Sequence, residues 1–376
     1  MYFILRAIIA CAGTGGHVNP GIAIAGIIKE REKDSEFLFI GTEKGIENEL
    51  VAKAGYEIKH IRTGKLYRKI TLKNFKSVFD TIAGIKDAKV IIKEFKPDIV
   101  IGTGGYICGA VMMAARQMKI PYVLHESNAF PGVAVKMLAK NASKVLVGFE
   151  DTKLRLKNKS NVIYTGSPAK FNTEKIDSLD KEECIRELGL EKLANGRKII
   201  FVTGGSQGAR KFNEVVTNLA LDKQSNKFFI VLCAGMKNYD DINKKLKNIK
   251  DSEKYIKLER FIFDMDKMYK AADLLITRAG AMTITELALS SKPAILVPFP
   301  YAAENHQYYN AKVLENAGAA KILIESEFNE QSLYDDIEQI IGSEDRLKIM
   351  SDAARSLQKN DVEQVIYSEI SNVVKR

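Results

Sequence analysis

A chain of 376 residues is about two domains long, because single hydrophobic cores rarely keep growing to this length. Its 46% hydrophobic and 28% charged residues exclude a largely disordered chain, and no apolar run reaches the ~18 residues of a membrane-spanning helix. Residues 1–160 hold 26 Lys and Arg against 15 Asp and Glu, a net +11, whereas 161–376 hold 31 against 32; this favours an anionic partner (nucleic acid, phosphorylated substrate or lipid surface) as readily as it favours mere solubility.

Short apolar runs recur along the chain, each followed by a turn and an amphipathic stretch. The first run lacks the basic start and cleavage site of a signal peptide, so we expect a buried strand there. The predicted strands are 3–11, 37–41, 98–102, 121–125, 144–148, 198–203, 228–234, 273–277, 294–298 and 320–324. Continuous apolar strands alternating with helices predict two doubly wound, Rossmann-like α/β domains with parallel sheets, whose carboxyl edges face each other across a cleft.

The stretch 65–93 is amphipathic and basic at its amino-terminal end. Its apolar positions recur at helical spacing, namely Phe75, Val78, Phe79, Ile82 and Ile85. Its basic residues are Lys65, Arg68, Lys69, Lys73 and Lys76. Packing against the first sheet explains this pattern as well as membrane contact does, but the net positive charge of the domain favours a helix that rests on anionic lipid.

Four predicted strands end in turns of small residues, at 13–17, 102–106, 203–208 and 278–283, and each turn leads into a predicted helix. Glycine allows a close approach of the backbone to a ligand, and a helix start presents free N–H groups, so such turns suit phosphate binding. One such turn is often a mere connector, whereas four are harder to explain in that way. None matches a P-loop, and Val18 and Ile107 replace the last glycine of a dinucleotide fingerprint, which disfavours kinases and oxidoreductases.

Taken together, the motifs at 13–17, 125–128, 204–210 and 281–286, with Gln307 and Asn310, resemble the MurG family of bacterial N-acetylglucosaminyltransferases. The resemblance spans roughly residues 5–325 and implies an inverting enzyme of GT-B fold that needs no metal and no cofactor. It implies transfer of N-acetylglucosamine from UDP-N-acetylglucosamine to undecaprenyl-diphospho-N-acetylmuramoyl-pentapeptide, as part of peptidoglycan synthesis. The expected partners are these substrates and the anionic inner face of the cell membrane, on the cytoplasmic side, with no nucleic acid.

The polar stretch after Gly166-Ser167-Pro168 separates the two predicted domains. We expect an acceptor- and membrane-facing domain over 1–165 and a UDP-sugar-binding domain over 166–345. Because the family's last helix crosses back to the first domain, the resemblance assigns 346–376 to that return.

The resemblance also carries the expected substrate-binding residues. They are Thr14, Gly15, Gly16, Asn128, Lys170, Ser206, Phe261, Ile262, Ala281, Met282, Thr283, Ile284, Thr285, Glu286, Gln307 and Asn310. Within this set, Glu286 suits the ribose hydroxyls as a carboxylate acceptor, although a charge near a helix start explains it too. Phe261 and Ile262 are expected beside the uracil. Lys170 stands where the family commonly has arginine, so it keeps the charge and loses the planar fork.

Inverting transfer needs a base for the attacking hydroxyl, and His17 at the tip of the first glycine turn is the first candidate. His17 would alternatively donate a hydrogen bond to phosphate. Glu126 is the weaker candidate, and the neighbouring His125 is either a third or a structural residue. Other readings of the chain are a glycolipid synthase using a UDP-hexose and diacylglycerol, a nucleotide-sugar epimerase, and a non-catalytic scaffold that docks on a membrane.

Overall fold

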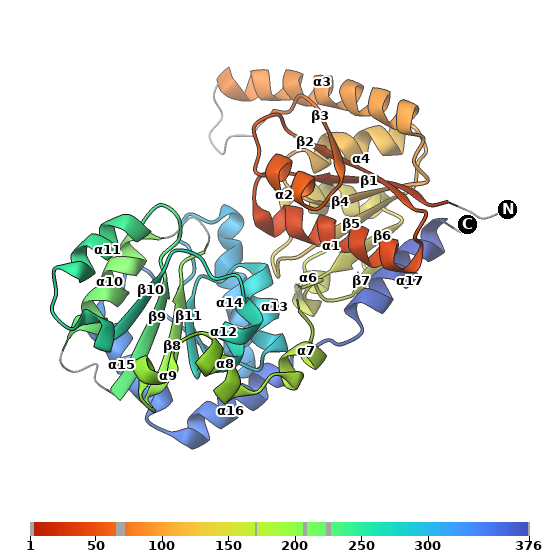
Figure 1. The fold of residues 1–376 in the computed structure, drawn as a ribbon. Coiled ribbons are helices and arrows are strands. Elements are labelled where there is room, and N and C mark those ends of the chain that lie inside the picture. The colour runs from red at the N-terminus through yellow and green to blue at the C-terminus, as the bar shows by residue number, and fades with distance from the viewer. Residues whose placement is uncertain (1–3, 65–71, 170, 206–208, 223–226, 375–376) are drawn as a thin grey trace. The chain divides into compact units, whose positions relative to one another are not determined.

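The computed structural model describes residues 4–64, 72–169, 171–205, 209–222 and 227–374, with side chains of the helix over 72–95 described from Phe79 onward. The chain divides into two compact units (Figure 1). The first unit comprises Met1–Lys170 and Asp361–Arg376, and the second comprises Phe171–Asn360. Both are parallel-sheet α/β units, as the sequence predicts.

The first unit is built on a parallel sheet with the strand order β3-β2-β1-β4-β5-β6-β7. Its strands are β1 (Arg6–Cys11), β2 (Glu36–Gly41), β3 (Glu57–His60), β4 (Ile99–Gly104), β5 (Tyr122–Glu126), β6 (Lys144–Val147) and β7 (Val162–Tyr164). Its helices are α1 (Gly15–Arg31), α2 (Glu47–Lys53), α3 (Leu72–Phe95), α4 (Cys108–Gln117), α5 (Val133–Leu138), η1 (Ala139–Asn141), α6 (Glu150–Leu154) and α17 (Val362–Val374).

Both faces of this sheet are covered, because alternate residues of each strand point to opposite sides. On β1, Ile8 belongs to the core beneath α3, α4 and α5, whereas Ile9 belongs to the core beneath α1 and α17. Figure 1 shows α3 and α4 on one side of the sheet and α1 on the other. Continuous burial on both faces explains why the inner strands have no polar alternation.

Helix α17 completes the first unit although it is the last helix of the chain. Ile366 and Ile370 are fully buried in the core beneath α1. Polar contacts also hold the helix, since the hydroxyl of Tyr367 donates to Glu32 at 2.8 Å and Lys144 pairs with Glu369 at 2.8 Å. The return begins at residue 361, and α16 (Glu344–Arg355) stays with the second unit, so the segment that joins the first unit is shorter than 346–376.

The second unit is built on a parallel sheet with the order β10-β9-β8-β11-β12-β13. Its strands are β8 (Lys198–Thr203), β9 (Phe228–Cys233), β10 (Ile256–Glu259), β11 (Leu274–Thr277), β12 (Ala294–Leu296) and β13 (Ala320–Ile322). Its helices are α7 (Thr173–Ser178), α8 (Lys181–Glu187), α9 (Glu191–Ala194), α10 (Arg210–Leu221), α11 (Tyr239–Lys247), η3 (Ser252–Lys254), α12 (Met265–Ala271), α13 (Ala281–Leu289), η4 (Ala303–Asn305), α14 (His306–Ala317), α15 (Glu330–Ile341) and α16.

The ten strands expected from the sequence are all present, with ends shifted by a few residues. Three further strands, β3, β7 and β10, were not expected. Each lies at an edge of its sheet, is only three or four residues long and contains half-exposed positions. All four cysteines are buried and free. No helix in the described part of the chain has the length and apolar character needed to cross a membrane.

Candidate functional site

Two glycine turns meet in the first unit because β1 and β4 are neighbours in its sheet. Gly104 and Gly105 have φ of +120° and +84°, a region that other residues rarely adopt. A Cβ on Gly105 would lie 2.1 Å from the carbonyl oxygen of Ala12, and one on Gly104 would lie 2.4 Å from Cδ2 of His17. Only glycine therefore allows the second turn to pack against the first.

The first of these turns opens α1 without a side-chain cap. Thr14 is the N-cap in an extended conformation, its side chain caps nothing, and no acidic residue lies in the first helical turn. A helix start leaves its first amides without partners inside the helix, and here they belong to Gly15 and Gly16. The exposed backbone of Thr14 and Gly16 thus presents a positive helix end that suits an anion.

Glu47, at the start of α2, fixes the shape of this turn, and no motif in the sequence indicates that role. The side chain is fully buried and accepts hydrogen bonds from the amide of Gly13 at 3.2 Å and from the amide and hydroxyl of Thr42 at 3.0 and 2.6 Å. Burial raises the pKa of Glu47, but these hydrogen bonds outweigh it and hold the pKa below its usual range. The glycine turn is therefore held by an ionised carboxylate.

His17 lies in the first turn of α1 and is half-buried. Its Nδ1 is 3.2 Å from the carbonyl oxygen of Ala12, so Nδ1 carries the proton as donor and Nε2 carries the lone pair. Burial lowers the pKa of His17 below 6.5 and outweighs the opposing effect of this hydrogen bond. The imidazole is therefore neutral at neutral pH and can accept a proton at Nε2.

The motif at 125–128 lies at the end of β5, at the same edge of the sheet, and its first three residues are buried. His125 is fully buried, and burial lowers its pKa to about 4. Glu126 is also buried, and its carboxylate accepts from the amide of Asn128 at 2.9 Å, from the side-chain amide of Asn128 at 3.0 Å and from the amide of Gly132 at 2.8 Å. Glu126 thus shapes the loop that carries the half-buried Asn128.

In the second unit, α13 begins directly after β11 in the same manner as α1. Gly280 is its N-cap in an extended conformation, with no side-chain cap and no acid in the first turn. Ala281 and Ile284 are buried against the core, whereas the remaining predicted residues of the motif, Met282, Thr283, Thr285 and Glu286, are half-buried. The hydroxyl of Thr285 donates to the carbonyl of Ala281 at 3.1 Å. The start of α13 is therefore a second helix end suited to an anion.

Glu286 is held by Tyr269, a residue that no motif in the sequence identifies as part of the site. The hydroxyl of Tyr269 on α12 donates to Oε2 of Glu286 at 3.0 Å. Tyr269 is almost fully buried, and burial, followed by the effect of Glu286 itself, raises the pKa of the tyrosine well above its usual range. Tyr269 therefore remains a protonated donor.

Gln307 and Asn310 lie on α14, and they differ in exposure. Gln307 is half-buried, and its Oε1 accepts from the amide of Phe299 at 2.9 Å. Asn310 is fully buried, and its side-chain amide donates at 3.1 Å to the carbonyl of Ala279, in the turn before α13. The loop leading to α14 includes Glu304, a non-glycine residue with φ of +55°. The structure thus ties α14 to the start of α13.

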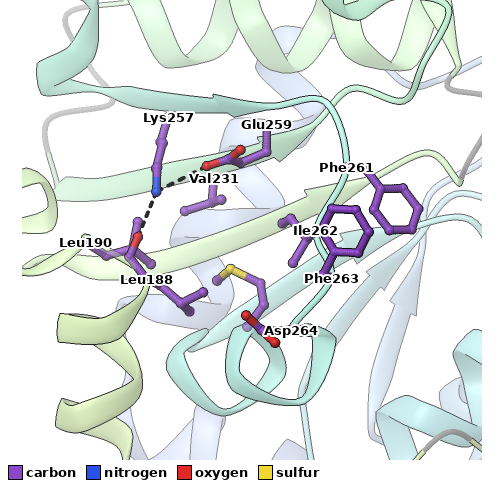
Figure 2. Close-up of a pocket in the computed structure, with 10 residues that line it drawn as sticks. Leu188, Leu190, Val231, Lys257, Glu259, Phe261, Ile262, Phe263 and Asp264 are labelled. Atoms are coloured by element: carbon purple, nitrogen blue, oxygen red, sulfur yellow. Dashed lines mark hydrogen bonds and ion pairs between the residues drawn. The ribbon is translucent and has the colours of Figure 1, made fainter.

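Phe261 and Ile262 follow the edge strand β10 and border a pocket of about 150 Å³ (Figure 2). The ring of Phe261 is 42% exposed and meets the ring of Phe263 edge-on at 4.9 Å, while Ile262 is buried. Lys257 donates to the carbonyl of Leu188 at 2.7 Å at the opposite side of the pocket. The full lining consists of Leu188, Leu190, Val231, Lys257, Glu259, Phe261, Ile262, Phe263, Asp264 and Met268.

The predicted site residues thus form two sets at the carboxyl edges of the two sheets. Thr14, Gly15, Gly16, His17, Glu126 and Asn128 belong to the first unit. Phe261, Ile262, the motif 281–286, Gln307 and Asn310 belong to the second. Lys170 and Ser206 lie outside the described residues. Glu47 and Tyr269 join these sets as supporting residues.

The chain has two parallel-sheet α/β units, each with an uncapped helix start at a glycine turn. Comparison with known protein families identifies the class of enzyme that has this architecture. The glycosyltransferase family 28 N-terminal domain matches residues 7–147, and the family 28 C-terminal domain matches residues 199–366. The chain belongs to glycosyltransferase family 28 and has the GT-B fold. It is a hexosyl-transferring enzyme of the N-acetylglucosaminyltransferase kind.

Individual relatives show which members of this family the chain is similar to. A protein of Acetivibrio thermocellus named "UDP-N-acetylglucosamine--N-acetylmuramyl-(pentapeptide) pyrophosphoryl-undecaprenol N-acetylglucosamine transferase" is 38% identical over 99% of both chains. A protein of the same name from Thermoanaerobacter sp. is 38% identical over 98% of this chain and all of its own. The crystal structure of Acinetobacter baumannii MurG matches with a TM-score of 0.76 and 28% identity, over 98% of this chain and 99% of that one. The expected resemblance to the MurG family is confirmed.

Proposed function

We propose that this enzyme transfers N-acetylglucosamine, with inversion, from UDP-N-acetylglucosamine to undecaprenyl-diphospho-N-acetylmuramoyl-pentapeptide. The observation that carries the proposal is full-length similarity to relatives named for this reaction. Their name includes both the donor nucleotide sugar and the lipid-linked acceptor. The two uncapped helix starts suit a reaction in which both substrates carry diphosphates.

The donor is proposed to bind mainly in the second unit. There the amide end of α13 receives the diphosphate of UDP, and Glu286 accepts hydrogen bonds from the ribose hydroxyls. Phe261 offers an exposed ring face for the uracil, next to the main chain of Ile262. Gln307 contacts the sugar hydroxyls, whereas the buried Asn310 acts indirectly by holding the turn before α13. Ser206 and Lys170 complete the proposed set on the basis of the resemblance alone.

His17 is proposed as the general base. The acceptor hydroxyl oxygen attacks C1 of N-acetylglucosamine, the bond from C1 to the UDP oxygen breaks, and the hydroxyl proton goes to Nε2 of His17. The leaving UDP carries away the electron pair, and the amide end of α13 stabilises its negative charge. Glu126 is the weaker candidate because three N–H groups already direct its carboxylate into its own loop. Thr14, Gly15, Gly16 and Asn128 are the other proposed substrate-binding residues of the first unit.

The assay that tests this function follows release of UDP from UDP-N-acetylglucosamine. We expect fast release only with the lipid-linked muramoyl acceptor, and a product that contains the added N-acetylglucosamine. Diacylglycerol in place of that acceptor should give no product, and the nucleotide sugar alone should give no epimer. Turnover with diacylglycerol, or epimerisation without an acceptor, would instead support one of the two rival enzymes.

The acceptor's lipid requires a membrane, and we propose that the first unit binds the cytoplasmic face of it peripherally. Helix α4 contacts both α3 and α5. Large apolar side chains are exposed on all three helices, with Phe79 at 70% and Met137 at 73% exposure. Among the side chains that the structure describes, the exposed ones are Phe79, Ile82 and Val90 on α3, Met113 on α4, and Val133 and Met137 on α5. Exposed apolar groups in a domain of net positive charge are typical of an anionic lipid surface.

The amphipathic pattern of the stretch 65–93 is also explained by packing against the core. Ile85 packs against the core, whereas Phe79 and Ile82 are exposed, so the helix has both a packed and a solvent-facing apolar side. Lys65, Arg68 and Lys69 lie outside the described residues, and the side chains of Lys73, Phe75, Lys76 and Val78 do as well.

A liposome experiment tests this surface. Phe79→Glu and Met137→Glu should reduce sedimentation with anionic vesicles, because each removes apolar area that the proposed lipid contact would bury and adds a charge that anionic lipid repels. Phe263→Glu is the matched control, since Phe263 is 88% exposed in the second unit. Vesicle binding that is equal for all four proteins would place the membrane surface elsewhere.

A further inference from the structure

Tyr269 is almost fully buried, and among the described residues of the second unit it is the largest side chain buried to this extent. The ring packs against Phe171 with centroids 5.6 Å apart and against Phe201 with centroids 6.2 Å apart. Phe201 comes from the central strand β8, and Phe171 lies just before α7. The phenol hydroxyl is therefore delivered to one fixed position by the core.

The hydroxyl meets a partly accessible carboxylate instead of a main-chain group. Its acceptor is Oε2 of Glu286 at 3.0 Å, on a different helix. A buried tyrosine needs only a carbonyl to satisfy its hydroxyl, as Tyr122 shows by donating to the carbonyl of Leu138 at 2.8 Å. The hydrogen bond to Glu286 therefore does more than provide the buried tyrosine hydroxyl with an acceptor. It also selects one orientation of the half-exposed carboxylate.

Such a contact affects binding because glutamate has several rotamers to lose. A hydrogen bond from a neutral donor to a carboxylate is stronger than one between neutral groups, so it holds the side chain before a ligand arrives. A carboxylate held in advance loses less conformational freedom on accepting ligand hydroxyls. Burial raises the pKa of Tyr269 well above its usual range, so the phenol remains a donor at neutral pH.

We propose that Tyr269 is a positioning residue for the donor, whose hydroxyl holds Glu286 in the orientation that accepts the ribose hydroxyls. The inference rests on the proposed function, in which Glu286 contacts the ribose. The inference predicts that the hydroxyl of Tyr269 helps the enzyme to discriminate between UDP and a nucleotide without ribose hydroxyls, although this hydroxyl contacts neither nucleotide.

The test measures binding of UDP and of 2′,3′-dideoxy-UDP by calorimetry to the wild type, Tyr269→Phe, Glu286→Ala and the double variant. Tyr269→Phe keeps the ring and removes only the hydroxyl. It should weaken UDP binding about three- to tenfold and leave dideoxy-UDP binding unchanged. In the Glu286→Ala background, Tyr269→Phe should cause no further loss. In turnover assays, Tyr269→Phe should raise KM for the donor with little change in kcat.

Tyr122→Phe is the matched control, because it removes an equally buried hydroxyl from the first unit. It should lower the melting temperature to a similar extent without changing UDP affinity. If Glu286→Ala binds UDP as tightly as the wild type, the placement of the ribose fails, and this inference fails with it. If Glu286→Ala weakens UDP binding but Tyr269→Phe does not, or weakens it equally for both nucleotides, only the role of Tyr269 is overturned.

Discussion

The close packing of the two glycine turns predicts a large effect from one methyl group at Gly104. In Gly104→Ala, the added Cβ would lie 2.4 Å from Cδ2 of His17, whereas ordinary contacts begin at 3.4 Å. The imidazole must then move by about 1 Å, and a displacement of this size near reacting atoms can cost about 10² in rate. The φ of +120° at Gly104 adds backbone strain of roughly 1–3 kcal/mol.

The assay compares the initial rate of acceptor-dependent UDP release, UDP affinity and melting temperature. Gly104→Ala should lower kcat about 10²-fold and reduce the melting temperature. Its affinity for UDP should stay normal, because UDP is proposed to bind mainly in the second unit. Gly109→Ala in α4 is the control, because nothing lies within 4 Å of its added Cβ. That variant should keep the wild-type rate and gain up to about 1 kcal/mol in stability. A folded Gly104→Ala enzyme with nearly wild-type kcat would refute the base role of His17.

Three further predictions follow from buried ionisable groups. His17→Ala should reduce kcat by about 10²–10⁴ with UDP affinity retained, and the acid limb of the wild-type kcat/KM profile should lie below pH 6.5, because burial lowers the pKa of the base; a limb above 6.5 would contradict this. Thermal stability should decline as pH falls from 6.5 towards about 4, where the unfolded chain protonates His125 and the native state does not; His125→Gln should flatten that decline, and an unchanged slope would exclude His125 as its source. Glu47→Gln replaces one of the two acceptor oxygens with an NH2 donor that must face the N–H of either Gly13 or Thr42. It should cost about 1–3 kcal/mol in denaturant unfolding, whereas wild-type stability would show that the carboxylate is dispensable.

The inner strands of both sheets could be predicted because burial on two faces leaves a continuous apolar run. The edge strand β3 could not, since its sequence, Glu57–His60, alternates polar and apolar residues and depends on pairing with β2. The same limit applies to β10, whereas β7 is apolar but only three residues long. An edge strand forms largely because it pairs with a neighbouring strand, and that neighbour is remote in the sequence.

The glycine turns of the site could also be predicted, because glycine followed by a helix has a local signature. The residues that hold the turns have none. Glu47 reaches Gly13 only because β1 and β2 are adjacent, and Tyr269 reaches Glu286 from the helix on the other side of β11 in the chain. The sequence likewise could not reveal that Asn310 is buried, since an amide on a helix usually faces solvent.

The return of α17 has a consequence for synthesis on the ribosome. The first unit lacks its last helix until residues 362–374 are made, about 200 residues after Lys170. At roughly 5–20 residues per second, that interval is about 10–40 seconds, during which the groove for Ile366 and Ile370 stays open. The nascent first unit therefore exposes this apolar surface until the second unit, which ends at Asn360, has been synthesised.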